Sequence, residues 1–426
     1  MATGTTLSHV FPLGSRLDER GHIEVGGCDT IELAREFGTP AYVVAEDDLR
    51  ARARAFAQAG REAGHEDFQV VFASKAFPCT AVLGLFAEEG LWCDVASGGE
   101  LHLALNAGFA PERILMHGNA KSVAELEMAL RAKVALIVVD NFDEIDRLAG
   151  LVEQGAGQGV LIRATPDVRG DTHEKISTGQ ADSKFGFSMA DLPAAIKRVR
   201  SIDGLSLEGL HAHIGSQLFE LNPFRYTAAA LVRTGDGVGG FSIYDLGGGL
   251  GVAHTEAQHP PEIEAWVGAV VGAAHEAGIG PDARLLVEPG RALTGNAGVT
   301  LYTVQSVKRN VSTWVGVDGG MSDNLRPMLY GAIYEAHVAD RFGGEMPCVI
   351  AGKHCESGDV IVREASLDDP RPGDVIVIPA TGAYGYAMAS NYNGVPRPPV
   401  IFCRDGDARV VVRRESFEDL TARDVL

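Results

Sequence analysis

Residues 68–76 read Phe68-Gln69-Val70-Val71-Phe72-Ala73-Ser74-Lys75-Ala76, a short apolar run that ends in a serine and a lysine. Further runs of this kind, rich in β-branched residues, recur at 91–95, 113–116, 135–139, 160–164, 207–213, 241–246 and 285–287. Stretches with helical periodicity separate them, and Ser122 and Glu125 in one of these have the spacing of a helix capping box. Such alternation predicts an α/β fold with a (β/α)8 TIM-like barrel, and a doubly wound open sheet is the alternative.

After about residue 298 the pattern changes to strands that are separated by turns, with little helix. The expected strands lie at 301–307, 315–317, 348–350, 360–362, 375–378 and 400–403. An earlier strand at 39–44 suits this β region better than it suits the barrel. The sequence therefore predicts a barrel domain at 46–297 and a mainly β domain made of 1–45 together with 298–426.

Composition and charge limit the classes of protein that this chain can be. Its 426 residues are 46% hydrophobic and 22% charged, which is typical of a soluble globular protein. A net charge of −20 argues against nucleic acid as a partner, and the sequence contains no apolar run long enough to cross a membrane. The six cysteines are scattered without a C-x-x-C pair, so we expect no disulfide scaffold, no zinc site and a cytoplasmic location.

Polar residues follow almost every expected barrel strand. Active sites of such barrels lie at the C-terminal ends of the strands, so these residues are expected to gather on one rim. In chain order they are Lys75, Asp94, His117, Asn119, Asp140, Arg163, His211, His213, Ser216, Gly247, Gly248, Gly249, Glu288 and Arg291.

Three features of this rim point to one kind of cofactor. Lys75 is either an amine that condenses with a carbonyl or a surface lysine. The glycines after the seventh strand form either a phosphate loop or a tight turn; they do not match a dinucleotide fingerprint, because Val252 stands where glycine is needed. Glu288 either pairs with Arg291 or holds a proton on a pyridine nitrogen. Taken together, the functional interpretations predict pyridoxal 5'-phosphate as an electron sink.

Motifs in order over nearly the whole chain carry a family resemblance. They include Phe72-Ala-Ser-Lys75-Ala, Asp94-Val-Ala-Ser-Gly-Gly-Glu100-Leu, residues 173–186, His211-Ala-His-Ile-Gly-Ser-Gln217, Glu288-Pro-Gly-Arg291, Asp323-Asn-Leu-Arg326-Pro-Met-Leu-Tyr330, Cys355-Glu-Ser-Gly-Asp359 and Gly382-Ala-Tyr384-Gly-Tyr. The chain resembles the pyridoxal-phosphate decarboxylases with an alanine-racemase-like barrel, and among them the branch that acts on diaminopimelate. The barrel and β domain of that family match the predicted elements.

The resemblance implies roles around the cofactor. Lys75 would form the Schiff base with its aldehyde, His213 would stack on the ring, and Glu288 would pair with the pyridinium nitrogen. The other residues that the resemblance places around the cofactor are Asp94, Arg163, Ser216, Gly248, Gly290, Arg291 and Tyr384.

The resemblance also implies roles toward the substrate and a second subunit. Arg291, Arg326 and Tyr330 would hold a distal carboxylate, Tyr384 would lie beside the substrate, and Glu356 would hold the distal ammonium group. Cys355 would protonate the carbon that remains after carbon dioxide leaves, so the catalytic set is Lys75, His213 and Cys355. In the family, Cys355 and Glu356 reach the active site of the partner subunit, which implies an obligate homodimer.

The implied activity is the decarboxylation of meso-2,6-diaminopimelate to L-lysine and carbon dioxide, the final step of lysine biosynthesis. Glu288 favours decarboxylation over racemisation, because the family's racemases place an arginine at that position. The alternatives are a decarboxylase for a related or carrier-bound amino acid in secondary metabolism, an ornithine or arginine decarboxylase, a Schiff-base aldolase without cofactor, and a non-catalytic homologue that binds pyridoxal phosphate.

Overall fold

A computed structural model describes residues 5–166, 183–237 and 239–425 of the chain. The contacts within the chain divide it into two compact units. The barrel unit comprises Arg52–Gly251 and Pro260–Ala292, and the sheet unit comprises Met1–Ala51, Val252–His259 and Leu293–Leu426. The domain boundaries after residues 45 and 297 that the sequence suggests stay a prediction.

The barrel unit contains a closed ring of parallel strands, as predicted from the alternating pattern. Its strands are β6 (Phe68–Ala73), β7 (Trp92–Val95), β8 (Ile114–Met116), β9 (Leu136–Val139), β10 (Gln158–Thr165), β12 (Leu205–His211), β13 (Ile243–Asp245) and β14 (Arg284–Val287). The pairing of β9 with β10 closes the ring, and the two-residue strand β11 (Phe187–Ser188) extends β10. The open-sheet alternative is thereby excluded.

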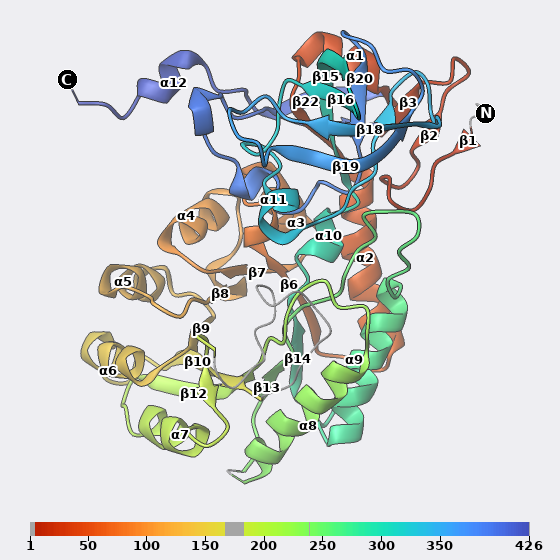
Figure 1. Cartoon of the computed structure of the whole chain (residues 1–426). Coiled ribbons are helices and arrows are strands. Elements are labelled where there is room, and N and C mark those ends of the chain that lie inside the picture. Colours follow the sequence, from red (N-terminus) through yellow and green to blue (C-terminus); the bar gives the residue numbers. More distant parts are fainter. Residues whose placement is uncertain (1–4, 167–182, 238, 426) are drawn as a thin grey trace. The chain divides into compact units, whose positions relative to one another are not determined.

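Helices connect these strands and lie around the ring (Figure 1). They are α2 (Glu46–Glu62), which enters the barrel unit, α3 (Thr80–Glu88), α4 (Gly98–Asn106), α5 (Val123–Ala132), α6 (Phe142–Leu151), α7 (Leu192–Arg200), α8 (Asn222–Asp236), α9 (Ile263–Ala277) and α10 (Arg291–Thr294), which leaves it. The predicted capping box is present at α5: the Ser122 side chain accepts from the backbone N–H of Glu125, whose carboxylate accepts from the backbone N–H of Ser122. Ser97 and Asn141 cap α4 and α6 in a similar way, so side chains fix where these helices begin.

The sheet unit is built on one large, mostly antiparallel sheet. Its strands are β5 (Ala41–Ala45), β15 (Gly298–Arg309), β16 (Thr313–Val317), β17 (His337–Val338), β18 (Met346–Ala351), β19 (Val360–Leu367), β20 (Val375–Ile378), β21 (Val400–Arg404) and β22 (Asp407–Val412). The early strand β5 lies between β15 and β21, antiparallel to the first and parallel to the second. It therefore joins the C-terminal β region, as the sequence predicts.

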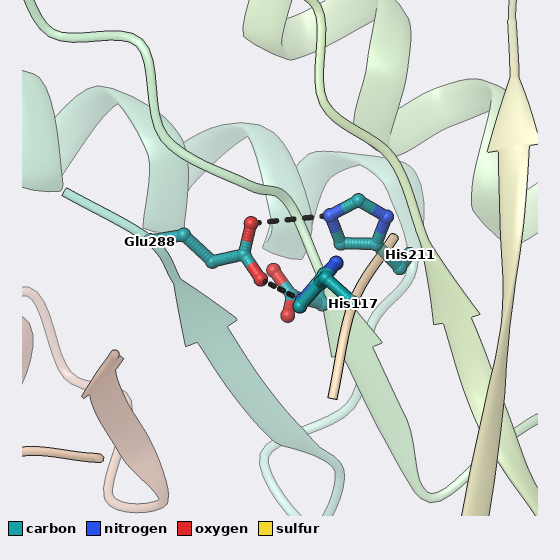
Figure 2. Close-up of side chains that lie close together, drawn as sticks. His117, His211 and Glu288 are labelled. Carbon is teal, nitrogen blue, oxygen red and sulfur yellow. Dashed lines mark hydrogen bonds and ion pairs between the residues drawn. The ribbon is translucent and has the colours of Figure 1, made fainter. Parts of the chain in front are cut away.

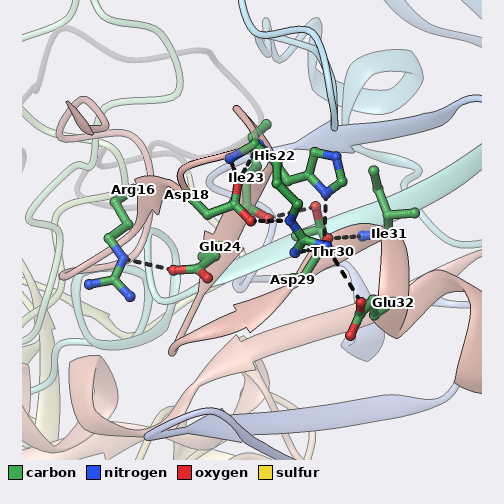
Figure 3. Close-up of polar contacts among 10 residues, drawn as sticks. Arg16, Asp18, His22, Ile23, Glu24, Asp29, Thr30, Ile31 and Glu32 are labelled. Atoms are coloured by element: carbon green, nitrogen blue, oxygen red, sulfur yellow. Dashed lines mark hydrogen bonds and ion pairs between the residues drawn. The ribbon is translucent and has the colours of Figure 1, made fainter. Parts of the chain in front are cut away.

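A small meander at the start of the sheet unit was not anticipated from the sequence. It consists of β1 (Thr5–Thr6), β2 (Arg16–Leu17), β3 (Ile23–Val25) and β4 (Cys28–Asp29), followed by α1 (Thr30–Phe37). Figure 3 shows the polar contacts that hold it: Asp29 caps α1 by accepting from the N–H of Ile31 at 2.8 Å and also contacts the ring of His22 at 2.9 Å. The short helices α11 (Arg326–Tyr330) and α12 (Phe417–Thr421) complete the unit.

Candidate active site

Side chains along a strand point alternately to its two faces, so every second residue faces the interior of the barrel. At the C-terminal end of the barrel these inward-facing residues are mostly polar. One buried apolar cluster contains Val71, Trp92, Leu115, Val138, Leu161, Ile243 and Leu286, which lie on seven different strands. The residue two positions further along a strand points to the same side. Those residues are Ala73, Asp94, His117, Asp140, Arg163, Asp245 and Glu288. All except Ala73 are ionisable, so a layer of ionisable groups, called the charged layer below, lies above the apolar layer.

The register of the ring places three of the strand ends at one level. Arg163 on β10 is paired with His211 on β12, which is paired with Asp245 on β13. All three residues are buried. The charged layer is therefore a consequence of where the parallel strands end.

Glu288 is clamped between two histidines in this layer. Its Oε1 lies 2.7 Å from Nε2 of His117, and its Oε2 makes a 3.2 Å hydrogen bond with Nε2 of His211 (Figure 2). The exposed fractions are 6% for Glu288, 6% for His117 and 1% for His211. Both carboxylate oxygens are thus held by imidazoles in a buried site.

The protonation states within this clamp follow from burial and from the neighbouring charges. Burial alone would raise the pKa of Glu288, but the two imidazoles outweigh it and hold the pKa well below its usual value. Burial opposes a charge on His117 as well, yet Asp94 and Glu288 raise its pKa above that of a free histidine. Burial lowers the pKa of His211 to about 4. Glu288 is therefore ionised, His117 is the charged partner, and His211 is the neutral one.

A second carboxyl group lies beside the clamp. Asp245 is fully buried, and its Oδ1 accepts from the backbone N–H of Gly247 at 2.9 Å. Burial, followed by the negative charge of Glu288, raises the pKa of Asp245 well above its usual value. Of these two carboxyl groups, Glu288 therefore carries the negative charge.

The glycines after β13 form a tight loop against the ends of neighbouring strands. Gly247 has a φ of +65°, a conformation that favours glycine. A Cβ atom at Gly248 would lie 2.1 Å from the backbone oxygen of Glu288, so only glycine fits there. The N–H of Gly248 donates to Nδ1 of His213 at 3.2 Å. Desolvation, together with the charges of Lys75 and Arg163, lowers the pKa of His213 well below its usual value, so this ring is neutral.

Lys75 stands at the end of β6, in the single turn η1 (Ser74–Ala76). Its side chain is exposed, in contrast to the buried Glu288. Gly290 lies against this turn, since a Cβ there would come within 3.2 Å of the Cβ of Ala76. The next residue, Arg291, is buried and donates from Nη2 to Oγ of Ser216 at 3.1 Å.

Comparison with known proteins places this arrangement in a family. Residues 46–295 match the model of the pyridoxal-dependent decarboxylase family, in its pyridoxal binding domain. The chain is 45% identical to the diaminopimelate decarboxylase of Halalkalibacterium halodurans over 430 residues, which covers 96% of this chain and 97% of that protein. The chain belongs to the diaminopimelate decarboxylase family.

Other members of the diaminopimelate decarboxylase family agree in sequence and in fold. The protein of Actinosynnema pretiosum is 46% identical over 424 residues, covering 98% of this chain and 95% of that protein. The crystal structure of the M. jannaschii member in complex with L-lysine has a TM-score of 0.90 at 32% identity, and the match covers 97% of this chain and 98% of that one. The barrel with its additional β sheet is therefore the fold of the family.

The residues of the barrel unit fit pyridoxal phosphate, the cofactor of the pyridoxal-dependent decarboxylases. A carboxylate that is buried and ionised, as Glu288 is, suits a protonated ring nitrogen. An exposed amine at Lys75 suits an aldehyde, and the glycine loop with Ser216 suits a phosphate group. The predicted cofactor residues Asp94, Arg163 and Gly290 also belong to this end of the barrel.

The other predicted substrate residues belong to the sheet unit. Arg326 begins α11 and is 5% exposed, and its Nη1 donates to Oη of Tyr334 at 2.6 Å and lies 3.1 Å from Nε2 of His254. Tyr330 ends the same helix and is half-buried. Tyr384 is also half-buried, with a φ of +62°.

Cys355 and Glu356 are both exposed and lie in a turn between β18 and β19. The buried Asp359 organises this turn: its Oδ2 accepts from the backbone N–H of His354 at 2.9 Å, and its Oδ1 from that of Met321 at 2.8 Å. The N–H of Cys355 donates to Oδ1 of Asn393 at 2.9 Å. Cys355 is therefore a loop thiol and not a buried apolar residue.

Sequence reasoning noted His117 and His211 at strand ends but gave them no role, and it did not single out Asp245. The signal that could have found them is the two-residue period, which places each on the inner side of its strand. The motif at 173–186 lies mostly outside the described residues, since 167–182 are not described. Within the described part of the chain, no helix has the length and apolar character needed to cross a membrane.

Proposed function

We propose that this chain removes one carboxylate of meso-2,6-diaminopimelate as carbon dioxide and releases L-lysine, with pyridoxal phosphate as its cofactor. The observation that carries the proposal is the buried, ionised Glu288 at the end of the barrel. The names of the curated relatives support the substrate, and the M. jannaschii structure is described as a complex with L-lysine.

In our proposal, different residues of the barrel unit hold different parts of the cofactor. When bound, pyridoxal phosphate supplies an electron-poor ring that accepts the electron pair left behind when carbon dioxide departs. In our proposal Lys75 binds its aldehyde and Glu288 holds a proton at its ring nitrogen. The neutral ring of His213 would stack on the cofactor ring, and Ser216 and Gly248 would bind the phosphate.

The proposed substrate contacts rest on charge pairing. A second carboxylate in the substrate needs a cation, because an unpaired buried anion is costly. Arg326 supplies that cation, and its contact with Tyr334 keeps the guanidinium in one orientation. Tyr330 and Arg291 are the other two residues proposed to bind this carboxylate. Glu356 binds the distal ammonium group. An ornithine or arginine decarboxylase has only a cationic substrate tail to recognise.

Cys355 is proposed to donate the proton that replaces the lost carboxylate. A thiol S–H group can donate a proton, as a general acid requires. Its exposed position on a turn leaves it accessible to a second chain. We therefore propose a homodimer in which Cys355 and Glu356 act in the barrel of the partner subunit.

We further propose that the protein acts in the cytoplasm. Its six cysteines are all free thiols, and five of them are buried. Thiols persist in reducing compartments, whereas disulfides form in oxidising ones such as the extracellular space.

A substrate panel tests the proposed function. Release of carbon dioxide from meso-diaminopimelate is expected to exceed that from ornithine, arginine and lysine by at least about a hundredfold, because only the first substrate pairs a distal carboxylate with Arg326. The variant Arg326→Ala is expected to lose that preference, while Arg309→Ala, which removes an exposed arginine, is expected to keep it. Equal rates across the panel, or faster turnover of a modified amino acid, would contradict the assignment.

A further inference from the structure

The clamp around Glu288 is unusual because it occupies both carboxylate oxygens with groups of one residue type. His117 contacts Oε1 at 2.7 Å and His211 contacts Oε2 at 3.2 Å, and the two rings meet edge to face with centroids 4.8 Å apart. The rings come from the ends of β8 and β12, on opposite sides of the strand that carries Glu288 in the order of the ring. The carboxylate therefore cannot rotate without breaking a contact on one side.

The short distances also favour one protonation pattern of the two rings. Two acceptors without a hydrogen between them repel one another at 2.7 to 3.2 Å, so the contacts favour a proton on each Nε2 that faces the carboxylate. Such nitrogens have no lone pair to offer to a metal ion, although His117, His211, Asp245 and Glu288 have ligand atoms within 4.8 Å of one another. The cluster is thus arranged to hold a carboxylate and not to chelate a cation.

The remaining charged neighbours also favour a negative charge on Glu288 and a positive charge on His117. Asp94 lies 3.9 Å from Nε2 of His117 and supports the charge on that ring. Asp245 holds its proton beside Glu288, and the guanidinium of Arg163 lies within electrostatic range of both. A negative charge in this layer is therefore concentrated on Glu288, at a fixed orientation.

We propose that His117 and His211 are positioning residues for the ring nitrogen of the cofactor: by holding the two oxygens of Glu288 they fix the direction and the charge of the carboxylate that faces that nitrogen. The inference rests on the role proposed for Glu288 and assigns a function to two histidines that touch the carboxylate rather than the substrate. His117 supplies a charged contact, and His211 supplies a neutral hydrogen bond.

The test compares two ligands that differ only at the ring nitrogen. The apo protein is titrated with pyridoxal phosphate and with an analogue in which a C–H group replaces that nitrogen, and binding is followed by protein fluorescence. In His117→Leu, affinity for pyridoxal phosphate is expected to fall about tenfold or more, because the close ionic contact with Glu288 is lost, while affinity for the analogue changes less than about twofold. His117→Gln, which keeps an N–H donor, is expected to restore most of the difference. His211→Leu is also expected to weaken the binding of pyridoxal phosphate more than that of the analogue, with a smaller loss of affinity than His117→Leu.

A matched control and a reference variant separate the possible outcomes. His65 is a fully buried histidine that precedes β6 and bonds to Ala283, so His65→Leu is expected to treat the two ligands alike. Equal weakening of both ligands in His117→Leu would show a merely structural role and would overturn the inference. Glu288→Gln is expected to discriminate between the ligands most strongly. If Glu288→Gln binds the two ligands with equally changed affinity, the role proposed for Glu288 itself is wrong. If Glu288→Gln discriminates between the ligands and the histidine variants do not, only the positioning role of the two histidines is wrong.

Discussion

Glu288 and Lys75 differ in burial, and the difference matches the work proposed for each. Glu288 is 6% exposed and keeps its charge only because two imidazoles offset the cost of burial. Lys75 stands exposed on a single turn beyond its strand, where an aldehyde can reach its amine. A group that must hold a fixed charge is thus enclosed, and a group that must react is accessible.

The role of Lys75 predicts a covalent product. Incubation with pyridoxal phosphate followed by borohydride is expected to leave a modified peptide containing residue 75, because reduction makes the bond between the amine and the aldehyde permanent. In Lys75→Ala this peptide is expected to be unmodified and decarboxylation to fall by at least about a thousandfold. Lys308→Ala, which removes an exposed lysine of β15, serves as the control for mass spectrometry. Modification at another lysine in the wild-type protein would contradict the assignment.

The raised pKa of the buried Asp323 predicts that the stability of the protein depends on pH. Burial raises its pKa to about 7, although the hydroxyl of Tyr302 and the N–H of Gly320 both bond to its carboxylate. Between about pH 4 and pH 7 the folded protein then binds one more proton at this residue than the unfolded chain. The free energy of unfolding is therefore expected to fall as pH rises through this range, by up to about 1.4 kcal/mol per pH unit from this residue.

Urea unfolding of the apo protein at several pH values between 4 and 7.5 measures this contribution. Asp323→Asn is expected to remove it and so to flatten the pH dependence. The exposed Asp424→Asn is expected to leave the wild-type slope unchanged. A slope that is the same in wild type and in Asp323→Asn would refute the expected proton uptake.

At the scale of secondary structure, the sequence predicts the strands of the repeating barrel pattern and misses the short strands outside it. The barrel strands were predictable because parallel strands buried on both faces are short apolar runs, and the polar residues that follow them mark where they end. The meander of β1 to β4 was not, because its strands are two or three residues long and are held by side chains such as Asp29. The clamp on Glu288 was not predicted either, since it joins strand ends that are far apart in sequence.

A buried ion pair joins two neighbouring connections of the barrel. Nζ of Lys121 lies 2.7 Å from Oε1 of Glu144 and donates to the carbonyl oxygens of Gly118 and Val138 at 2.7 Å each. Neither charged side chain is more than 1% exposed. The pair thereby fixes the segment after β8, which carries His117, to the end of β9.

Removing one charge of this pair is expected to be costly. Lys121→Met leaves the buried Glu144 without its cation, although Oε2 still accepts from the backbone N–H of Asp140. The substitution is expected to lower the free energy of unfolding of the apo protein by about 3 to 5 kcal/mol in urea. The double variant Lys121→Met with Glu144→Gln is expected to recover part of that loss. Arg131→Ala breaks an exposed pair with Glu127 on α5 and is expected to cost no more than about 0.5 kcal/mol. A loss for Lys121→Met as small as that for Arg131→Ala would show that water reaches the pair.

For the whole molecule, the proposed homodimer makes each active site depend on two chains. Lys75→Ala and Cys355→Ala are each expected to be inactive. When equal amounts are mixed under conditions of subunit exchange, about half of the dimers are hybrids, and each hybrid has one site with both residues intact. Activity is therefore expected to return to about a quarter of the wild-type rate.

Native mass spectrometry with one variant isotopically labelled provides the control for exchange. If hybrids form and no activity returns, each active site is complete within one chain, and the proposed sharing of Cys355 is wrong.

The position of β5 between β15 and β21 has a consequence for biosynthesis. This strand is entirely buried, yet both of its neighbours follow the barrel sequence. Translation at 5 to 20 residues per second takes roughly 13 to 50 s to proceed from β5 to β15, the first of the two neighbours to be synthesised. During that interval the nascent chain carries an apolar strand whose partners in the sheet do not yet exist, while the barrel can already fold, so this segment is expected to need protection by a chaperone at the ribosome.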